Sequence, residues 1–508
     1  MKLASGSWPA QWLGIFWVVV IAPVLAADGV DNRASTGSGV LEHHGSAQRT
    51  GMFVVPSLTF ERAAHVRRDP AFNAAISGAV YAQPLYWHAP GNDKALLIIA
   101  TEQNDVYALD ALSGAVVWKT SLGPPVPRAA LPCGNIDPLG ITGTPVIDER
   151  SRALYVAALI KAQDGPKHEI FALSLGNGAI LSGWPIDVEA KLKESGRDFR
   201  SEVQNQRGAL TILQDTLYVP YGGHFGDCGD YRGRVVGVSL QQRHVVHSWS
   251  TRARGGGIWA TGGLASDGRS IFAVTGNTFG ANSWADGEAV VRLGADLSFS
   301  GKPQDFFAPS DWRQLDITDS DLGGSNALVL TLPGATPSEL VLALGKDGKA
   351  YVLDRANLGG IGGSVVAKKV SADPIRTAPA AFPAGNEMRV ALQGRGTGCP
   401  RGTSGDLTVI AIAAGAPPTL SVAWCAALKG RGSPIVTTTD GKADPIVWAV
   451  GAEGDNRLHG FRGDTGAEVF SGGEAGDAMG GVRRFQTLIA AGEHLYVAAD
   501  GHVYAFRF

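Results

Sequence analysis

One short phrase recurs along the chain, and this repetition limits the possible folds more than any other feature. In the clearest copy, residues 106–118, an apolar run enters the turn Asp-Ala-Leu-Ser-Gly, and a second apolar run ends on Trp118. Asp and Ser bond their own backbone in such turns, and Gly supplies a positive φ angle. Less complete copies of the phrase recur about every 50 to 65 residues, which indicates a repeat architecture. They occur at 170–184, 350–355, 457–470 and 503–508.

Eight entry segments can be counted, each with small residues or a Pro before an apolar run. They begin near Gly78, Gly140, Gln204, Gly255, Asp321, Arg376, Gly430 and Met479. The last repeat ends one strand short of a four-stranded unit, and 52–55 or 57–61 could supply that strand and remove the open edge. We therefore predict an all-β fold, an eight-bladed β-propeller of four-stranded antiparallel blades over residues 51–508, closed by an N-terminal strand. A series of β-sandwiches is disfavoured because the repeats are alike and evenly spaced. One helix is expected, around 187–195.

Composition supports short strands joined by tight turns and narrows the range of partners. The chain has 508 residues, of which 68 are Gly, and a formal net charge of −3. A chain of this length usually forms two or three domains, but repeat folds escape that rule. Lys and Arg are scattered, without a basic stripe among aromatic residues. We therefore expect no nucleic-acid partner and no general attraction to anionic membranes.

The N-terminus has the pattern of a secretory signal peptide, predicted over residues 1–27. Lys2 provides the positive start, 13–25 form an apolar run, and Val-Leu-Ala at 24–26 is a cleavage sequence. An apolar run of about 13 residues is too short to span a bilayer, which needs roughly 20. We expect a periplasmic or secreted protein without a membrane span. Residues 28–50 are polar and rich in Gly and Ser, so they are expected to form a disordered linker that includes His43 and His44.

The four cysteines of an exported chain should be paired, and four allow three connectivities. Cys399 and Cys425 flank one strand-turn-strand unit, so we predict that they bond to each other. Cys133 and Cys228, in two Gly-rich loops, would then join neighbouring repeats. A metal site is a poor alternative, because the cysteines are far apart and none has Cys-x-x-Cys spacing.

The repeat phrase resembles the tryptophan-docking repeat of the quinoprotein alcohol dehydrogenase-like propellers, over nearly all of the chain after residue 52. The wording of 131–145 and 432–440 also resembles secreted bacterial proteins with quinone-type repeats. That superfamily holds enzymes that use pyrroloquinoline quinone (PQQ) and non-catalytic scaffolds of outer-membrane assembly, so the resemblance implies a fold and leaves the function open. Signatures of hydrolases, zinc proteases, phosphate-binding loops and covalent haem are missing from the sequence.

Four residues match the parts of a PQQ site in the order that the family has them. Enzymes of the family stack PQQ on a Trp, and Trp259, in Gly-Gly-Gly-Ile-Trp, takes that place. Asn277, in Val-Thr-Gly-Asn, takes the place of an amide metal ligand, and such an oxygen suits a hard cation. Asp321 takes the place of the catalytic, metal-binding carboxylate, with Asp319 beside it as a further metal ligand. Lys346 takes the place of the donor to the quinone oxygen.

Three parts of the family pattern differ in this chain. The adjacent Cys pair that covers the quinone is absent, and only Cys133 lies in that region. The metal-ligating Glu is not in its place, where Asp227 or Asp230 stands one residue out of step. The chain is shorter than the family's enzymes and has no attached cytochrome, so electrons would leave to a separate acceptor.

Two functions follow from these matches and differences. The first is an exported PQQ-dependent dehydrogenase that oxidises an alcohol or a sugar, with Ca²⁺ or a lanthanide held by Asn277, Asp321 and Asp227. Asp321 would act as general base, and Lys346 would stabilise charge on the quinone oxygen. The second is a non-catalytic scaffold that binds protein or polysaccharide in the cell envelope. A lyase that uses a metal and His224 is less favoured, because a lone loop His is more often structural. The first function requires the four matched residues to meet in one axial pocket.

Overall fold

The structure is a computed structural model, which describes residues 1–4, 6, 35–36, 39–89, 91 and 94–508. The predicted signal peptide falls almost wholly on residues outside this part of the chain, as does the stretch 28–34 of the predicted linker. From residue 35 onwards the described residues belong to one structural unit. Among the described residues, no helix is both long and apolar enough to cross a membrane.

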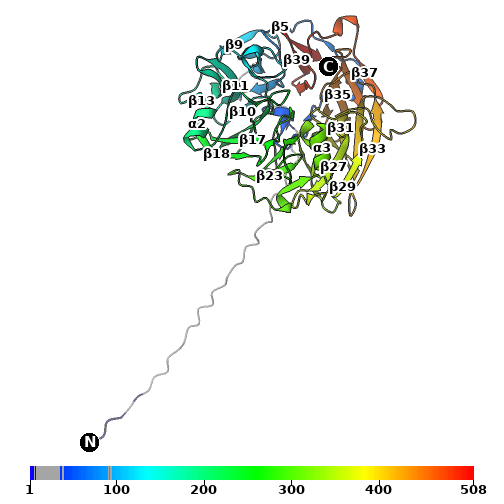
Figure 1. Cartoon of the computed structure of the whole chain (residues 1–508). Coiled ribbons are helices and arrows are strands. Elements are labelled where there is room, and N and C mark those ends of the chain that lie inside the picture. Colours follow the sequence, from blue (N-terminus) through cyan, green and yellow to red (C-terminus); the bar gives the residue numbers. More distant parts are fainter. Residues whose placement is uncertain (5, 7–34, 37–38, 90, 92–93) are drawn as a thin grey trace. The chain divides into compact units, whose positions relative to one another are not determined.

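Eight antiparallel sheets stand around a ring and form the blades of a β-propeller (Figure 1). We number them in chain order, and in each blade the strands follow one another from the centre outwards. Blade 1 holds β6 (Leu85–His88), β7 (Ala95–Ala100), β8 (Asp105–Asp110) and β9 (Val116–Ser121); blade 2 holds β10 (Val146–Asp148), β11 (Ala153–Ala162), β12 (Gly165–Ser174) and β13 (Ile186–Asp187); blade 3 holds β15 (Thr211–Leu213), β16 (Thr216–Gly223), β17 (Arg234–Ser239) and β18 (His244–Ser250); blade 4 holds β20 (Ala265–Ser266), β21 (Ser270–Val274), β23 (Val290–Gly294) and β24 (Phe306–Ala308).

The second half of the ring repeats the same plan. Blade 5 holds β25 (Leu328–Thr331), β26 (Glu339–Leu344), β27 (Lys349–Asp354) and β29 (Val366–Lys369); blade 6 holds β30 (Ala380–Ala384), β31 (Glu387–Gln393), β32 (Leu407–Ala413) and β33 (Thr419–Ala426); blade 7 holds β34 (Ile435–Thr438), β35 (Ile446–Val450), β36 (Leu458–Arg462) and β37 (Glu468–Ser471); blade 8 holds β38 (Ile489–Ala491), β39 (His494–Ala499) and β40 (His502–Arg507). Short accessory strands flank blades 3 and 4: β14 (Gln204–Asn205), β19 (Arg254–Gly255), β22 (Thr278–Phe279) and β28 (Gly360–Ile361).

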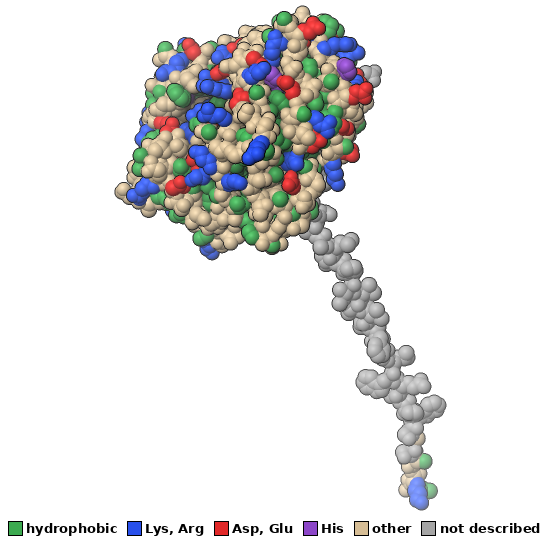
Figure 2. Space-filling view, turned by 90° about the vertical axis from the view of Figure 1, so that its right-hand side faces the viewer, with side chains coloured by type: hydrophobic (Ala, Val, Ile, Leu, Met, Phe, Trp, Pro, Cys, Tyr) green, Lys and Arg blue, Asp and Glu red, His purple; other side chains and the backbone are tan. Residues whose placement is uncertain are grey.

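The predicted fold class is confirmed, because each of the eight predicted entry segments leads into the first strand of a blade. The expected helix is α2 (Val188–Glu194), and the described residues also contain α1 (Phe60–Ala63) and α3 (Trp312–Thr318), which were not predicted. On the side of the molecule that Figure 2 shows, Lys and Arg side chains are interspersed with Asp and Glu, and hydrophobic side chains form only small separate areas.

The tryptophan of the repeat phrase fastens one blade to the next. Trp118 of β9 donates its Nε1 hydrogen to the Leu175 carbonyl of blade 2, at 2.9 Å. Its ring lies against Gly178, where an added Cβ would stand only 2.5 Å from a ring carbon. Trp424 of β33 makes the same bond to the Gly463 carbonyl of blade 7, also at 2.9 Å. The phrase therefore pairs a Trp with a Gly turn because the two meet between neighbouring blades.

The ring is closed from the N-terminal side, but by other residues than predicted. The outer part of blade 8 is β4 (Arg67–Arg68) and β5 (Ala74–Ala75), both antiparallel to β40. The expected strand, β3 (Met52–Val54), instead pairs in parallel with β34, the first strand of blade 7. Residues 57–61 end in α1. The prediction went wrong because Met52 and Phe53 are both buried, which suits a strand inside the ring, whereas an outer strand buries one face only.

Residues 39–55, which we call the plug, lie in the middle of the ring (Figure 1). They include β2 (Gly39–Val40), the 3₁₀ turn η1 (His43–Gly45) and β3. The plug makes hydrogen bonds with every blade. These join β2 to β6, Leu41 O to Ile147 N, Arg49 Nη2 to Leu210 O, Ala47 O to Ser266 N, Gln48 O to Val329 N, Thr50 O to Ala381 N, Gly51 O to Val436 N, and His44 Nε2 to Thr487 Oγ1.

The disordered linker is therefore wrong for residues 39–50. Arg49 is fully buried and forms an ion pair with Glu42 at 2.8 Å. His43 and His44 are also buried, and burial lowers the pKa of His44 to about 3, so its ring is neutral. The polar and Gly-rich composition that suggested disorder supplies hydrogen-bonding groups to a channel whose walls are strand backbone.

Candidate functional site

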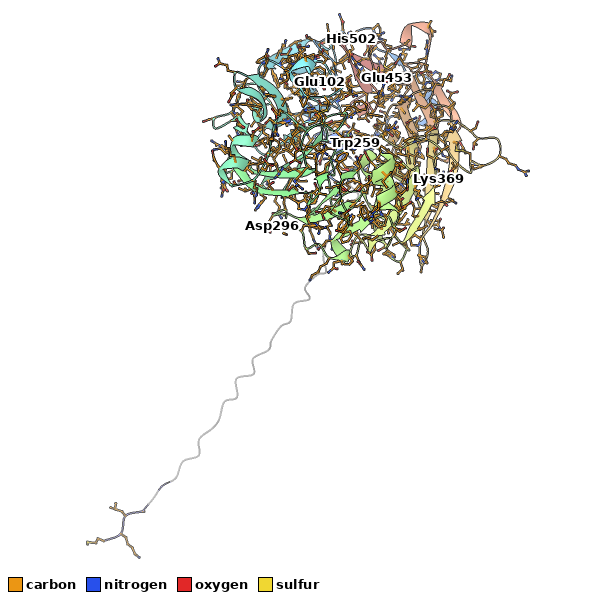
Figure 3. The ribbon with its side chains drawn as sticks, in the orientation of Figure 1. Glu102, Trp259, Asp296, Lys369, Glu453 and His502 are labelled. Carbon is orange, nitrogen blue, oxygen red and sulfur yellow. A yellow bond between two sulfur atoms is a disulfide. The ribbon has the colours of Figure 1, made fainter. Side chains whose placement is uncertain are left out.

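The loops that lead into blades 4 and 5, together with the turn between β26 and β27, bring Trp259, Asp321 and Lys346 together. Trp259 donates its Nε1 hydrogen to Asp321 Oδ2 at 2.9 Å, and Lys346 Nζ lies 2.8 Å from the same oxygen. Lys346 Nζ also lies 5.2 Å from the centre of the Trp259 ring. Trp259 is found near the middle of the ring of blades (Figure 3). Three of the four matched residues thus share one site at the axis.

The local backbone explains how Asp321 reaches this position. The helix α3 ends at Thr318, and the next residue, Asp319, has a positive φ of 50°, so the chain changes direction before Asp321. The Lys346 amide then donates to the Asp321 carbonyl at 2.9 Å. A Cβ on Gly276 would stand 3.2 Å from Asp321 Cγ and 3.3 Å from Trp259 Nε1, so glycine leaves these two groups room to meet.

The other predicted residues lie around this group. Asp319 is exposed and accepts a hydrogen bond from Lys346 Nζ at 2.7 Å, so Lys346 stands between two carboxylates. Asn277 is 7% exposed and follows Gly276, and its carbonyl accepts from the Gly256 amide. Asp227 accepts the hydroxyl hydrogen of Tyr231 at 2.5 Å. Burial, followed by the charges of Asp227 and Asp321, raises the pKa of Tyr231, which therefore stays protonated.

Glu288 belongs to the site, and the sequence analysis did not single it out. It is fully buried, and its Oε2 accepts from the Leu322 amide at 2.6 Å. Glu288 Oε1 and Asp321 Oδ1 are both buried without a hydrogen-bond partner among the described residues. Burial and the charge of Asp321 raise the pKa of Glu288 well above its ordinary value. Its signal in the sequence is a single Glu after a Gly, which would not distinguish it from a turn residue.

The pKa values of Asp321 and Lys346 reflect the same burial. Burial raises the pKa of Asp321, although Lys346 and the Trp259 indole oppose this effect. Burial lowers the pKa of Lys346, but the Asp321 and Asp319 carboxylates outweigh it, so the net shift is upward. Lys346 therefore remains a cation at neutral pH, and Asp321 is a stronger base than an ordinary aspartate.

A second buried acid, Glu102, was also not predicted. It lies between β7 and β8, is 1% exposed, and accepts from the Gly140 amide at 2.7 Å and the Thr142 hydroxyl at 2.8 Å. Burial raises the pKa of Glu102 to about 7, while Arg207 and Arg483 oppose the shift. This carboxyl group consequently titrates near neutral pH.

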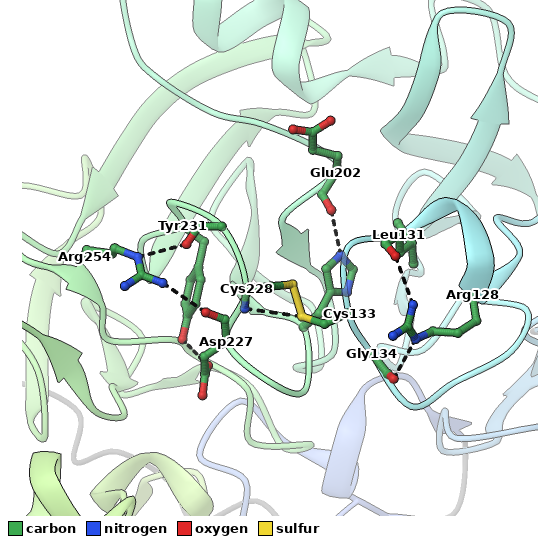
Figure 4. The surroundings of a disulfide bond; sticks show 11 residues. Arg128, Leu131, Cys133, Gly134, Glu202, Asp227, Cys228, Tyr231 and Arg254 are labelled. Atoms are coloured by element: carbon green, nitrogen blue, oxygen red, sulfur yellow. Dashed lines mark hydrogen bonds between the residues drawn. A yellow bond between two sulfur atoms is a disulfide. The ribbon is translucent and has the colours of Figure 1, made fainter.

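Both predicted disulfide pairings are present, Cys133–Cys228 and Cys399–Cys425. The first ties the loop after blade 1 to the loop of blade 3 that carries Asp227 (Figure 4). His224 in that loop bonds the Glu202 carbonyl at 3.2 Å, and burial lowers its pKa to about 4. His224 is thus a neutral residue that holds the loop.

Comparison with known proteins finds solved structures with a similar fold. No protein-family model matches the chain, and no curated protein sequence matches it. Among solved structures, the quinohemoprotein alcohol dehydrogenase ADHIIG from Pseudomonas putida HK5 superposes with a TM-score of 0.64 at 14% identity, over 92% of this chain and 75% of its own. The quinohemoprotein alcohol dehydrogenase from Comamonas testosteroni gives 0.63 at 13% identity, over 95% and 82%.

A europium-containing methanol dehydrogenase superposes with a TM-score of 0.60 at 13% identity, over 93% of this chain and 98% of its own. The chain therefore has the eight-bladed propeller fold that these alcohol and methanol dehydrogenases share, as its repeat phrase predicted. Identity at this level establishes the fold alone, and an activity has to be argued from the site.

Proposed function

We propose that this protein is an exported dehydrogenase that binds PQQ and a cation at the Trp259–Asp321 site and oxidises an alcohol or a sugar. The observation that carries the proposal is the meeting of Trp259, Asp321 and Lys346 on the axis, next to buried carboxylate oxygens that lack partners. The two disulfides suit an oxidising compartment outside the cytoplasm.

The buried acids fit a cation. Buried polar atoms are nearly always bonded, yet Asp321 Oδ1 and Glu288 Oε1 have no donor among the described residues. Asp321 and Glu288 would hold a cation, whose charge would relieve the repulsion between the two acids. Ca²⁺ and lanthanides take oxygen ligands, and the Asn277 amide is a further candidate. Asp319 and Asp227, which the sequence analysis also proposed as metal ligands, would not bind the cation directly, since Asp319 pairs with Lys346 and Asp227 with Tyr231.

The residues of the chain would divide the work as follows. PQQ would supply the hydride-accepting chemistry when bound at Trp259, and a cation held by Asp321 and Glu288 would supply Lewis-acid chemistry. Trp259 offers a flat aromatic face for stacking. Asp321, whose pKa is raised by burial, takes the proton of the substrate hydroxyl. Lys346 is a fixed positive charge beside Asp321 and would stabilise negative charge on the quinone oxygen. Such a reaction would require a separate electron acceptor.

Reconstitution tests the proposal. The purified protein is dialysed with PQQ and either Ca²⁺ or La³⁺, retained PQQ is measured by absorbance, and dye-linked oxidation is followed with alcohols and sugars. We expect retention of PQQ with one metal and turnover that Asp321→Asn abolishes. Asp69→Asn is the matched control, because Asp69 is a buried acid of blade 8 that bonds His494. Failure to retain PQQ with either metal overturns the proposal, and activity in Asp321→Asn overturns the assignment of the base.

One observation favours the second candidate, a non-catalytic propeller that binds an envelope protein or polysaccharide. Lys346 Nζ lies 2.8 Å from Asp321 Oδ2, so the two charges are already paired without any ligand. In a scaffold, Lys346 would neutralise Asp321 permanently. Capture of a partner from envelope extract that is equally efficient with wild type and Asp321→Asn would support this candidate.

A further inference from the structure

Asp316 of α3 bonds a residue that directly follows a candidate cation ligand. Its Oδ1 accepts from the Thr278 amide and its Oδ2 accepts from the Thr278 hydroxyl, both at 2.7 Å. Thr278 comes next after Asn277, whose amide is the candidate ligand, and Asp316 lies shortly before Asp321 in the chain. We call this pair of bonds the clamp. It joins the segment that carries Asn277 to the segment that carries Asp321.

The same threonine contacts the third segment of the site. A Cβ added to Gly287 would clash with the Thr278 methyl group, so the Thr278 side chain lies directly on the backbone beside Glu288. The Glu288 amide in turn donates to the Gly276 carbonyl at 2.9 Å. The three segments that carry the candidate ligands of the cation therefore meet around one residue, and the clamp fixes that residue to α3.

Asp316 serves the site without being a ligand itself. Both of its oxygens accept hydrogen bonds from Thr278, whereas Asp321 Oδ1 and Glu288 Oε1 are buried without a partner among the described residues. Burial and the charge of Asp321 raise the pKa of Glu288 most, and the charge of Asp316 adds to them, so Asp316 is close to the buried acids. Thr278 is only 5% exposed, so water competes little with the clamp.

We propose that Asp316 is a positioning residue of the cation site, and that through Thr278 it holds the Asn277 amide in a fixed place relative to Asp321. The inference rests on the proposed function, because it requires a cation at Asp321 and Glu288. The strand that follows Asn277 pairs with its neighbour over two residues only, so the clamp is a main restraint on this segment. Hard cations bind more tightly where their oxygen ligands are held rigidly.

Terbium luminescence tests the proposal, since it measures cation binding without turnover. Tb³⁺ takes oxygen ligands as Ca²⁺ and La³⁺ do, and Trp259, which bonds Asp321, would sensitise its emission. The purified chain is titrated with Tb³⁺, and loss of the signal in Asp321→Asn would assign it to this site. Asp316→Ala, which removes both acceptors, should bind Tb³⁺ about tenfold or more weakly. Thr278→Val, which loses the hydroxyl but keeps the amide, should lose less.

Asp316→Asn separates the clamp from the charge. Its oxygen can accept from the Thr278 amide and its nitrogen can donate to the Thr278 hydroxyl oxygen, so both bonds are kept without the charge. We expect this variant to bind Tb³⁺ within about threefold of wild type, because solvent and salt screen the lost charge. Asp311→Ala is the matched control. It removes an acid just before α3 that pairs with Lys349 instead of Thr278, and it should leave the affinity unchanged.

Two results would overturn the positioning role while wild type binds Tb³⁺. One is unchanged affinity in Asp316→Ala, and the other is an equal loss in Asp316→Asn and Asp316→Ala, which would show that the charge acts and the clamp does not. Thermal unfolding shows whether each variant is folded. If Asp316→Ala is unstable, wild-type affinity in Thr278→Val overturns the role instead. Failure of wild type to bind Tb³⁺ would overturn the proposed function itself, so the two failures are distinguishable.

Discussion

Replacing Glu102 with Gln tests the electrostatics of the axial region quantitatively. Burial raises the pKa of this carboxyl group from 4.5 to about 7. The folded protein therefore holds the proton more tightly than the unfolded chain does. The group favours folding fully below about pH 4.5, and this contribution is lost as the pH rises through about 7.

The size of the effect follows from the shift. The difference between 7 and 4.5 corresponds to about 3 kcal/mol. Gln cannot ionise, and it has almost the same shape; its oxygen can accept from Gly140 while its amide donates to the Thr142 oxygen. We expect the variant to exceed wild type at pH 8 by up to about 3 kcal/mol and to show no gain at pH 4.5. With an unfolding entropy of roughly 1 kcal/mol/K for a chain of this length, the gain in Tm is about 3 °C.

The assay is calorimetric unfolding of both proteins at several pH values between 4.5 and 8. Glu453→Gln is the control, because burial raises the pKa of Glu453 but its bonds to Arg484 outweigh burial and lower it. That variant should gain nothing at pH 8. The reasoning is refuted if Glu102→Gln differs from wild type by the same amount at both ends of the range, or if it is less stable at pH 8.

Three further predictions concern the fold. Gly178→Ala should lower the free energy of unfolding in urea by about 2–4 kcal/mol, since φ is +71° there and the added Cβ would meet the indole of Trp118. The control is Gly176→Ala, which should be nearly neutral because an added Cβ would have only one contact, at 3.7 Å. Removing the Cys133–Cys228 bond should lower the free energy of unfolding by about 5 kcal/mol, and removing the Cys399–Cys425 bond by about 3.5 kcal/mol. The first loss is larger because that bond closes a loop of 95 residues, against 26 for the second, and equal losses of Tm would contradict this reasoning. Arg49→Met should cost about 3–5 kcal/mol, because the half-buried Glu42 loses its cation and the carbonyls of Leu210 and Leu264 lose a donor. An unchanged unfolding midpoint would show that the plug adds little to stability.

The fold could be predicted from the sequence because each blade repeats a local requirement. The Asp-x-x-Ser-Gly turn and the Trp that follows it make contacts within one blade or with the next one, as Trp118 does with Gly178. The closing strands could not be predicted, because Arg67–Arg68 and Ala74–Ala75 are only two residues long each and carry no apolar run.

The site was predicted only where a resemblance pointed to it. Trp259, Asp321 and Lys346 were found in this way, and the structure brings them together. Glu288, Asp316 and the plug were not found, because their importance depends on which distant segments meet in the folded chain. Single polar residues in loops carry no periodic signal that would reveal such a meeting.

The plug also sets the order in which the molecule can assemble. Met52 pairs with Val436, and His44 with Thr487, so part of the plug depends on partners from the last two blades. Contacts so distant in sequence form slowly, because a long loop must close before they stabilise anything. Until blade 8 has formed, the inner strands leave apolar surface exposed. Incomplete chains then have unpaired strand edges that promote aggregation. Completion of the ring is therefore a late, all-or-none step, and a chain that is truncated at its C-terminus would be exposed to proteases and to aggregation along its whole length.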